Sequence, residues 1–227
     1  AHAHIVDKYF TVIHTKTLSR DEIRKLIGAK FENLTPIIDK LIDVYYLMSN
    51  DGLGSDCPFE KYLTSRGKFI SLRDLMKWCS RISPKFNLRS SQYATYVFQD
   101  AQDCFLGSVP QSQDKLTVLE SIGAKLNMAK SQTEFYVNKF KPKINETELA
   151  IVVGRSEVCK KKNTTLKRLS LSSTTFSYTR QAVNLLESIC AAVNNVEPLL
   201  LVGETGVGKT ACVQYLAFKT GHSLRVI

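Results

Sequence analysis

The stretch Gly203-Glu-Thr-Gly-Val-Gly-Lys-Thr210 decides the fold of the sequence around it. It matches the phosphate-binding loop pattern G-x-x-x-x-G-K-[ST] at every defined position. That pattern needs a β-strand before the loop and an α-helix after it. The apolar run Leu199–Val202 comes directly before the loop, and apolar residues recur with helical spacing over Lys209–Ala217. The context therefore predicts the strand, loop and helix that open a parallel-sheet nucleotide-binding domain.

Each kind of residue in this loop suits contact with nucleotide phosphates. Glycines let the backbone turn tightly and direct its N–H groups toward phosphate oxygens, and the helix N-terminus adds a positive dipole end. Lys209 would place its charge beside the β- and γ-phosphates, and the Thr210 hydroxyl is a ligand for Mg²⁺. A glycine-rich turn that carries Lys-Thr by chance is the alternative, and the strand–loop–helix context argues against it. The sequence therefore predicts ATP and Mg²⁺ as cofactors, held by Gly203, Glu204, Thr205, Gly206, Val207, Gly208, Lys209 and Thr210.

Hydrolysis of ATP requires more than this loop. A P-loop ATPase also needs an acidic Mg²⁺ ligand at the end of a later strand and a residue that orients the attacking water. Both normally follow the loop, and seventeen residues follow Thr210. Glu204 lies inside the loop and does not replace them. We therefore expect no catalytic residue in this chain, weak ATP binding at best, and no hydrolysis.

The sequence up to about residue 141 predicts a helical domain. Ser19 with Glu22 forms a capping box, in which each side chain accepts a hydrogen bond from the other residue's backbone N–H. Ser71 repeats the cap with an acid in the first turn, and Thr35-Pro36 places a cap before a proline at the first helical position. Apolar residues then recur at three- and four-residue spacing over six segments, at about 20–28, 36–48, 71–82, 90–105, 113–127 and 131–140.

The pattern changes near Pro142. Leu149–Val153 is a short β-branched run ended by a glycine, and it predicts a strand. A second strand is expected around Leu169–Leu171, within a basic and Ser/Thr-rich loop. Thr179 caps a helix that leads toward the phosphate-binding loop.

Length and composition fit two domains. The 227 residues are 44% hydrophobic and 23% charged, as in ordinary folded proteins. We expect an α/β chain with a mainly helical domain over residues 1–141, followed by the start of a P-loop NTPase parallel-sheet domain over residues 142–227. No apolar run reaches the ~18–20 residues of a membrane span. The first ten residues show no secretory signal, so we expect a soluble intracellular protein without membrane contact.

The net charge of +10 is unevenly distributed. Residues 151–227 carry ten basic against four acidic residues, and much of the surplus lies in Arg155–Arg168. One interpretation of this stretch is contact with RNA or an acidic protein through Lys160–Arg168, and the other is a solvated loop. No aromatic residue within Lys160–Arg168 offers a base a stacking surface.

Several further stretches accompany the loop. They are EPLLLV directly before it, Phe176-Ser-Tyr-Thr-Arg180 before a helix, Ile122-Gly-Ala-Lys-Leu-Asn127, Phe135-Tyr-Val-Asn-Lys139, and Ser71-Leu-Arg-Asp-Leu-Met-Lys-Trp-Cys-Ser-Arg-Ile82. Together they resemble the midasin family of AAA+ ATPases, dynein-like proteins of ribosome assembly. The resemblance covers nearly the whole chain and is weakest in 83–113 and 155–172. The loop alone would indicate only a P-loop NTPase.

The resemblance implies parts of two AAA+ modules. Residues from about 17 to 141 would be the tail and helical lid of the first module, and residues from about 142 the start of the second. In such lids an arginine in a Ser-x-Arg-Asp helix start serves as sensor 2 and touches nucleotide phosphates, and Arg73 occupies that position. The nucleotide that it reads would belong to the first module's own P-loop. A surface arginine is the alternative, although a cation in the first helical turn opposes the helix dipole.

The resemblance also implies a function and a location. Members of this family use ATP to remodel pre-ribosomal large-subunit particles during assembly and nuclear export, in the nucleolus and nucleoplasm. The expected partners are those particles, their assembly factors, and other AAA+ modules of the same chain. A different class stays open: a non-hydrolysing, nucleotide-gated binding module that contacts RNA or an acidic protein through Lys160–Arg168. A small P-loop kinase is disfavoured because most of the chain precedes the loop.

Overall fold

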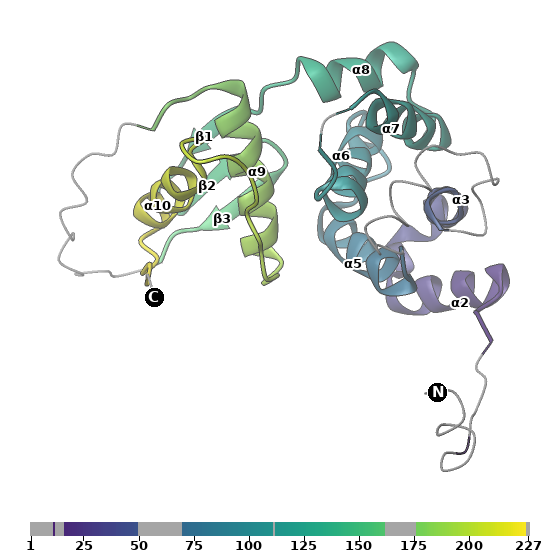
Figure 1. Cartoon of the computed structure of the whole chain (residues 1–227). Coiled ribbons are helices and arrows are strands. Elements are labelled where there is room, and N and C mark those ends of the chain that lie inside the picture. Colours follow the sequence, from purple (N-terminus) through teal and green to yellow (C-terminus); the bar gives the residue numbers. More distant parts are fainter. Residues whose placement is uncertain (1–10, 12–15, 50–69, 111, 162–175, 226–227) are drawn as a thin grey trace.

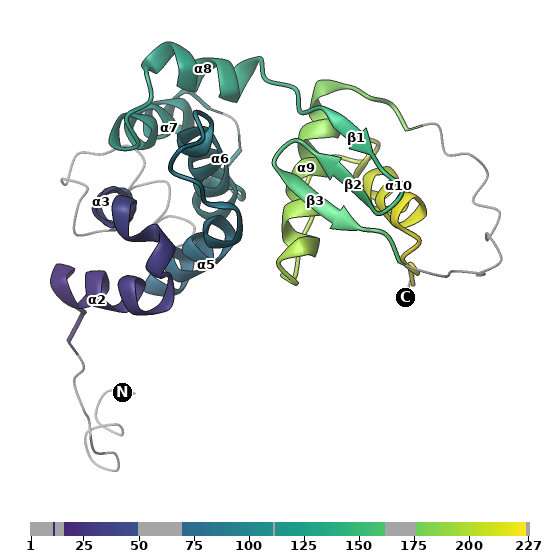
Figure 2. The ribbon, with the colours of Figure 1, turned by 180° about the vertical axis from the view of Figure 1, so that it is seen from behind.

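The computed structural model describes residue 11 and residues 16–49, 70–110, 112–161 and 176–225. Two bodies lie side by side in Figure 1 and Figure 2: a helical body over residues 20–138, and a sheet body over residues 144–220 in which helices cover a small sheet. The helical body contains α2 (Arg20–Lys30), η1 (Glu32–Ile37), α3 (Ile38–Met48), α5 (Leu72–Ile82), η2 (Ser83–Lys85), α6 (Tyr93–Leu106), α7 (Gln113–Lys125) and α8 (Lys130–Asn138). The sheet body contains β1 (Ile144–Glu146), β2 (Ala150–Val153), β3 (Ser156–Cys159), α9 (Arg180–Asn194) and α10 (Lys209–Thr220). None of the helices in the described ranges combines the length and the apolar character needed to cross a bilayer.

Two of the predicted helix starts are confirmed as capping boxes. The Ser19 N–H donates to Glu22 Oε2 (2.7 Å), and the Glu22 N–H donates to Ser19 Oγ (3.4 Å). The Ser71 N–H donates in the same way to Asp74 Oδ2 (2.9 Å). These contacts involve groups that a helix start would otherwise leave without partners, so α2 and α5 begin where the local sequence specifies.

Two other helix boundaries differ from the prediction. α2 continues for two residues past Gly28, where the sequence was expected to end it. The cap expected at Thr35-Pro36 is wrong, because Pro36 lies inside the 3₁₀-helix η1 and α3 begins at Ile38. The Thr35 hydroxyl donates to the Glu32 C=O (2.5 Å) instead of accepting from a helix amide. The 3₁₀ turn therefore accommodates a proline that has no N–H to contribute to an α-helix.

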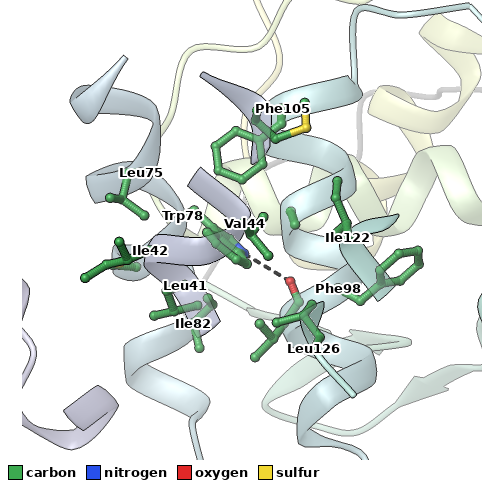
Figure 3. Close-up of a cluster of buried hydrophobic side chains, with 14 of the residues drawn as sticks. Leu41, Ile42, Val44, Leu75, Trp78, Ile82, Phe98, Phe105, Ile122 and Leu126 are labelled. Carbon is green, nitrogen blue, oxygen red and sulfur yellow. Dashed lines mark hydrogen bonds between the residues drawn. The ribbon is translucent and has the colours of Figure 1, made fainter. Parts of the chain in front are cut away.

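Trp78 lies at the centre of the core of the helical body (Figure 3). Its side chain is fully buried, and its indole N–H donates to the Val97 C=O (3.0 Å). The Phe105 ring meets it edge-on, with ring centroids 5.2 Å apart. A buried tryptophan contributes a large apolar area but needs a partner for its N–H, and here both conditions are met. The other labelled side chains come from α3, α5, α6, α7 and the C-cap of α7: Leu41, Ile42, Val44, Leu75, Ile82, Phe98, Ile122 and Leu126.

The strand predicted at Leu149–Val153 is confirmed as β2, which lies between β1 and β3 in an antiparallel sheet. Ile151 of β2 pairs with Val158 of β3. Gly154, with a φ of 54°, and Arg155 form the tight turn between these two strands. The apolar side chains of the sheet pack against α9 and α10, which lie together on one face of it (Figure 2).

The strand predicted at Leu199–Val202 does not form, and this part of the prediction is wrong. Leu200 and Val202 are 85% and 84% exposed. A β-strand needs a neighbouring strand to take up its backbone hydrogen bonds, and no strand of the described residues pairs with this run. The strands that the structure describes pair only antiparallel, so the expected parallel sheet is not confirmed. The strand expected around Leu169–Leu171 lies outside the described residues.

Candidate nucleotide-binding site

The predicted phosphate-binding loop, Gly203–Thr210, connects the exposed apolar run to the start of α10. Gly206 and Gly208 have left-handed backbone angles, with φ of 87° and 86°. A Cβ added at either position would meet no heavy atom within 4 Å, so the backbone conformation, and not close packing, requires glycine there. Gly208 is also the N-cap of α10. The loop therefore turns directly into a helix N-terminus.

One side-chain cation and a helix N-terminus lie at this loop. The Lys209 ammonium donates to the C=O groups of Gly203 (2.8 Å) and Glu204 (2.6 Å), which holds it over the loop. Within α10, which the structure describes in full, the first turn carries no acidic side chain and no side-chain cap. The N–H groups of that turn and the positive end of the helix dipole therefore face the loop. Because the loop is exposed from Gly203 to Val207, the arrangement suits an anionic phosphate group that approaches from solvent.

Thr210, the predicted Mg²⁺ ligand, is the second residue of α10 and is exposed. In the described part of the chain, no three His, Cys, Asp or Glu side chains are grouped so as to hold a metal ion. Thr210 would hold a Mg²⁺ ion through its hydroxyl, beside the phosphates of the nucleotide. That environment fits Mg²⁺, which keeps several waters when it binds beside a substrate's phosphates. The assignments of ATP, Mg²⁺ and the eight loop residues stay predictions.

Arg73, the residue assigned as sensor 2, lies in the first turn of α5 with an exposed side chain. α5 belongs to the helical body and α10 to the sheet body, and the two helices lie apart in both Figure 1 and Figure 2. The structure therefore does not bring Arg73 to the loop at Gly203–Thr210. The resemblance places Arg73 at the nucleotide of a different module, and that role stays a prediction.

A cluster of buried charges, which the sequence did not predict, joins the two bodies. Arg155, in the turn between β2 and β3, donates from Nε to Asp100 Oδ1 (3.1 Å) and from Nη2 to Asp103 Oδ2, both on α6. Its Nη1 pairs with Glu187 Oε2 on α9 (2.8 Å), and its backbone N–H donates to Glu187 Oε1 (2.8 Å). The Arg155 side chain is only 6% exposed. Arg155 begins the basic stretch Arg155–Arg168, and its burial shows that this residue is not part of a solvated loop. The RNA contact predicted through Lys160–Arg168 does not include it.

A second contact, between Arg81 and Glu197, crosses between the same two bodies. Arg81 Nε donates to Glu197 Oε1 (2.9 Å) and Arg81 Nη2 to Glu197 Oε2 (2.5 Å), which makes the contact bidentate. Lys77, one turn earlier on α5, pairs with Glu197 Oε2 (2.9 Å). The Arg81 Nη1 atom is buried without a hydrogen bond, 3.7 Å from Asp103 Oδ2. The Arg81 and Glu197 side chains are 6% and 13% exposed, so this ion pair is largely shielded from solvent.

The buried charges shift one another's ionisation. Burial lowers the pKa of Arg81, but the hydrogen bond and charge of Glu197, with neighbouring groups, raise the pKa above its ordinary value. Burial likewise lowers the pKa of Arg155, and the carboxylates around it raise that pKa by more. For Glu197, burial raises the pKa, and the hydrogen bonds from two cations lower it by more. Both arginines and Glu197 therefore stay charged at neutral pH.

The sequence holds one weak signal of these contacts. Arg81 lies on α5 between Cys79 and Ile82, both of which face the core. Asp100 likewise interrupts the buried side of α6. Charged residues at core-facing positions indicate buried partners. The partners themselves cannot be read from the sequence, because Arg81 and Glu197 are 116 residues apart.

Comparison with known proteins shows similarity to midasin. A family model described as the midasin AAA lid domain matches residues 22–129, which contain α2 from its third residue through the end of α7. The midasin of Dictyostelium discoideum is 25% identical over a 288-residue alignment that covers 99% of this chain but only 5% of the relative's length. The midasin of Giardia intestinalis is 51% identical over 49 residues, which cover 22% of this chain and 1% of that relative. No solved structure matches. The resemblance seen in the sequence is thus confirmed: residues 22–129 match the midasin AAA lid domain, and the similarity to midasin extends over nearly the whole chain.

Proposed function

We propose that this chain is the nucleotide-binding segment of a midasin-like AAA+ mechanoenzyme, with ATP and Mg²⁺ held at Gly203–Thr210. The observation that supports this proposal is the loop itself, in which two left-handed glycines lead into the N-terminus of α10 and Lys209 lies over the loop. Such a loop offers N–H donors, a helix dipole and a cation at one point, which suits the β- and γ-phosphates of ATP. The chain's residues would bind and orient the nucleotide, and Mg²⁺ would neutralise charge between its phosphates.

The role of the whole protein is proposed from the similarity to midasin. An assembly of AAA+ modules would use ATP to remodel pre-ribosomal large-subunit particles and release their assembly factors, in the nucleolus and nucleoplasm and on the way to nuclear export. Residues 22–129 would act as the lid of one module, and residues from about 142 as the beginning of the next. In this proposal the partners of the chain are those particles, their assembly factors and the neighbouring modules.

Nucleotide binding is tested by titrating the 227-residue chain with a fluorescent ATP analogue and Mg²⁺. We expect weak but saturable binding, and a Kd about tenfold higher for Lys209→Ala because the phosphates lose their cation. Lys139→Ala removes an exposed lysine at the end of α8 and should leave the Kd unchanged. Equal affinity of Lys209→Ala and the unaltered chain would contradict the proposed site. We expect no ATP turnover, and turnover that Lys209→Ala abolishes would contradict that expectation.

The alternative, a non-hydrolysing module that contacts RNA through Lys160–Arg168, gains no support from the described residues. Lys160 pairs with Glu146 (2.8 Å), and the Lys161 N–H donates to the Thr220 C=O (3.0 Å). Residues 162–175 lie outside the described ranges. RNA contact stays a prediction, and a gel-shift titration with single-stranded RNA tests it.

A further inference from the structure

The C-terminus of α9 is closed by a Schellman motif. The Glu197 N–H donates to the Ala192 C=O (2.9 Å), and the Val196 N–H donates to the Val193 C=O (3.1 Å). This motif places its central residue in the left-handed region, and Val196 has a φ of 53°. Glycine usually occupies this position, because it adopts a positive φ without strain.

Valine is a strained residue at this position. A β-branched side chain with a positive φ crowds its own backbone. Among the described residues, the only other non-glycine residue with a positive φ is Asn127, and asparagine tolerates that conformation. The Val196 side chain is 91% exposed, so packing does not offset the strain. A conformation of this kind persists only when surrounding contacts hold it.

Glu197, the next residue, makes contacts that can hold the turn. Its carboxylate receives two hydrogen bonds from Arg81 and an ion pair from Lys77, all from α5 in the helical body. Further along, the half-buried Leu201 packs against the core of the sheet body. The segment that leads to the phosphate-binding loop is thus held at Glu197 by the helical body and at Leu201 by the sheet body.

We propose that the turn Asn195–Glu197 is a strained latch, held by Arg81, through which the helical body sets the path of the chain into the phosphate-binding loop. While Arg81 holds Glu197, the strained turn stays closed. When α5 moves away from α9, Glu197 loses its partners, Val196 leaves the left-handed conformation, and the segment toward the loop takes a new direction. The effect on nucleotide binding rests on the proposed function, whereas the strain and its release do not.

Hydrogen exchange tests whether Arg81 holds the turn. The Val196 and Glu197 amides are hydrogen-bonded while the turn is closed, and their exchange rates report its opening. Arg81→Met removes the cation and keeps an extended side chain, whereas Lys130→Met removes an exposed, paired cation from α8 and serves as the matched control. In the 227-residue chain we expect Arg81→Met to raise exchange at both amides about tenfold, and Lys130→Met to leave it unchanged.

The strain is tested by adding Val196→Gly. Glycine adopts the left-handed conformation freely, so the turn should then stay closed even when Arg81 is replaced. We expect Arg81→Met to raise exchange by less than about threefold in the Val196→Gly background. An equal effect in both backgrounds would overturn the latch, as would unchanged exchange in Arg81→Met alone. If Arg81→Met does not fold, Glu197→Gln provides the same comparison from the other side of the contact.

Nucleotide affinity tests the connection between the latch and the loop. With the fluorescent ATP analogue, we expect Arg81→Met to raise the Kd about fivefold, and the same change in the Val196→Gly background to raise it less than twofold. A Kd that Arg81→Met leaves unchanged would overturn the connection. Failure of the unaltered chain to bind the analogue would instead contradict the proposed function, and the exchange rates would still decide for or against the latch.

Discussion

Gly154 lies against Glu187 so closely that no side chain fits between them. A Cβ built at residue 154 would overlap Glu187 Oε1 and come within 2.9 Å of the Pro142 Cβ. The same Oε1 atom accepts the Arg155 N–H (2.8 Å), so the turn between β2 and β3 places a backbone donor on a buried carboxylate. The tight turn and the buried charge cluster therefore meet at a single glycine.

Replacing this glycine should destabilise the sheet body. Gly154→Ala would combine a positive φ with the overlap at Glu187, and we expect it to lower the free energy of unfolding by about 2 kcal/mol or more. Urea unfolding followed by circular dichroism measures the loss. Gly28→Ala, inside α2, is the matched control, because a Cβ there would make an ordinary 3.7 Å contact with Ile38 of α3. We expect Gly28→Ala to stabilise the fold by ~0.5–1 kcal/mol. Equal effects of the two substitutions would contradict the close approach.

Removing Arg155 should cost more than removing an exposed arginine. Arg155→Met leaves the carboxylates of Asp100, Asp103 and Glu187 without their shared cation, and we expect a loss of about 3–5 kcal/mol in the free energy of unfolding. Arg89→Met, at an exposed position, should change it by less than ~0.5 kcal/mol. A loss below ~1 kcal/mol for Arg155→Met would show that these carboxylates do not depend on the cation.

Acid should weaken the contact between Arg81 and Glu197. A carboxyl group whose pKa is lower in the folded state stabilises the fold above its ordinary pKa and loses that contribution as pH falls through the folded value. Glu197 is such a group, because hydrogen bonds from cations outweigh the effect of burial on its pKa. We expect the free energy of unfolding to differ between the unaltered chain and Glu197→Gln by a constant amount above about pH 5, and by less below about pH 4.

Urea unfolding between about pH 3 and pH 7 measures this dependence. Glu148→Gln, at an exposed position between β1 and β2, controls for the loss of one carboxylate and should change the free energy of unfolding by less than ~0.5 kcal/mol. A difference for Glu197→Gln that stays constant down to the lowest pH would contradict the lowered pKa.

Arg73 should be independent of the loop at Gly203–Thr210. Because its side chain is exposed in the helical body, we expect Arg73→Ala to leave the Kd for the ATP analogue unchanged, and to change the free energy of unfolding by less than ~0.5 kcal/mol. Lys209→Ala is the positive control in the same titration. Weaker nucleotide binding by Arg73→Ala would place Arg73 at this loop and contradict its assignment to another module.

Local signals in the sequence predicted local structure. The caps at Ser19 and Ser71, and that of Thr179 on Ala182 N–H, depend on residues three positions apart, so the chain carries the whole contact within one turn. The left-handed turns at Gly206 and Gly208 are likewise local, because glycine adopts a positive φ without a distant partner. For these features the sequence was sufficient.

Features that depend on distant partners were missed or misassigned. The run Leu199–Val202 has the composition of a buried strand, but a strand forms only beside another strand, and composition does not show whether one is present. The sequence shows a charged residue at Arg81, but it does not show that Glu197 is the partner of that charge. Arg155 was grouped with the basic residues that follow it, because sequence proximity does not reveal which way a turn directs its side chain.

The helical body and the sheet body contact each other through buried ion pairs, and such a contact differs from an apolar one in what it exposes on separation. The two apolar cores are separate, one within the helical body and one within the sheet body, and the ion pairs of Arg81 and Arg155 lie between them. Parting the bodies at these contacts would expose ions, which water solvates readily. A separation of the two bodies at these ion pairs would therefore leave charged side chains, which favour solubility, on the parted surfaces.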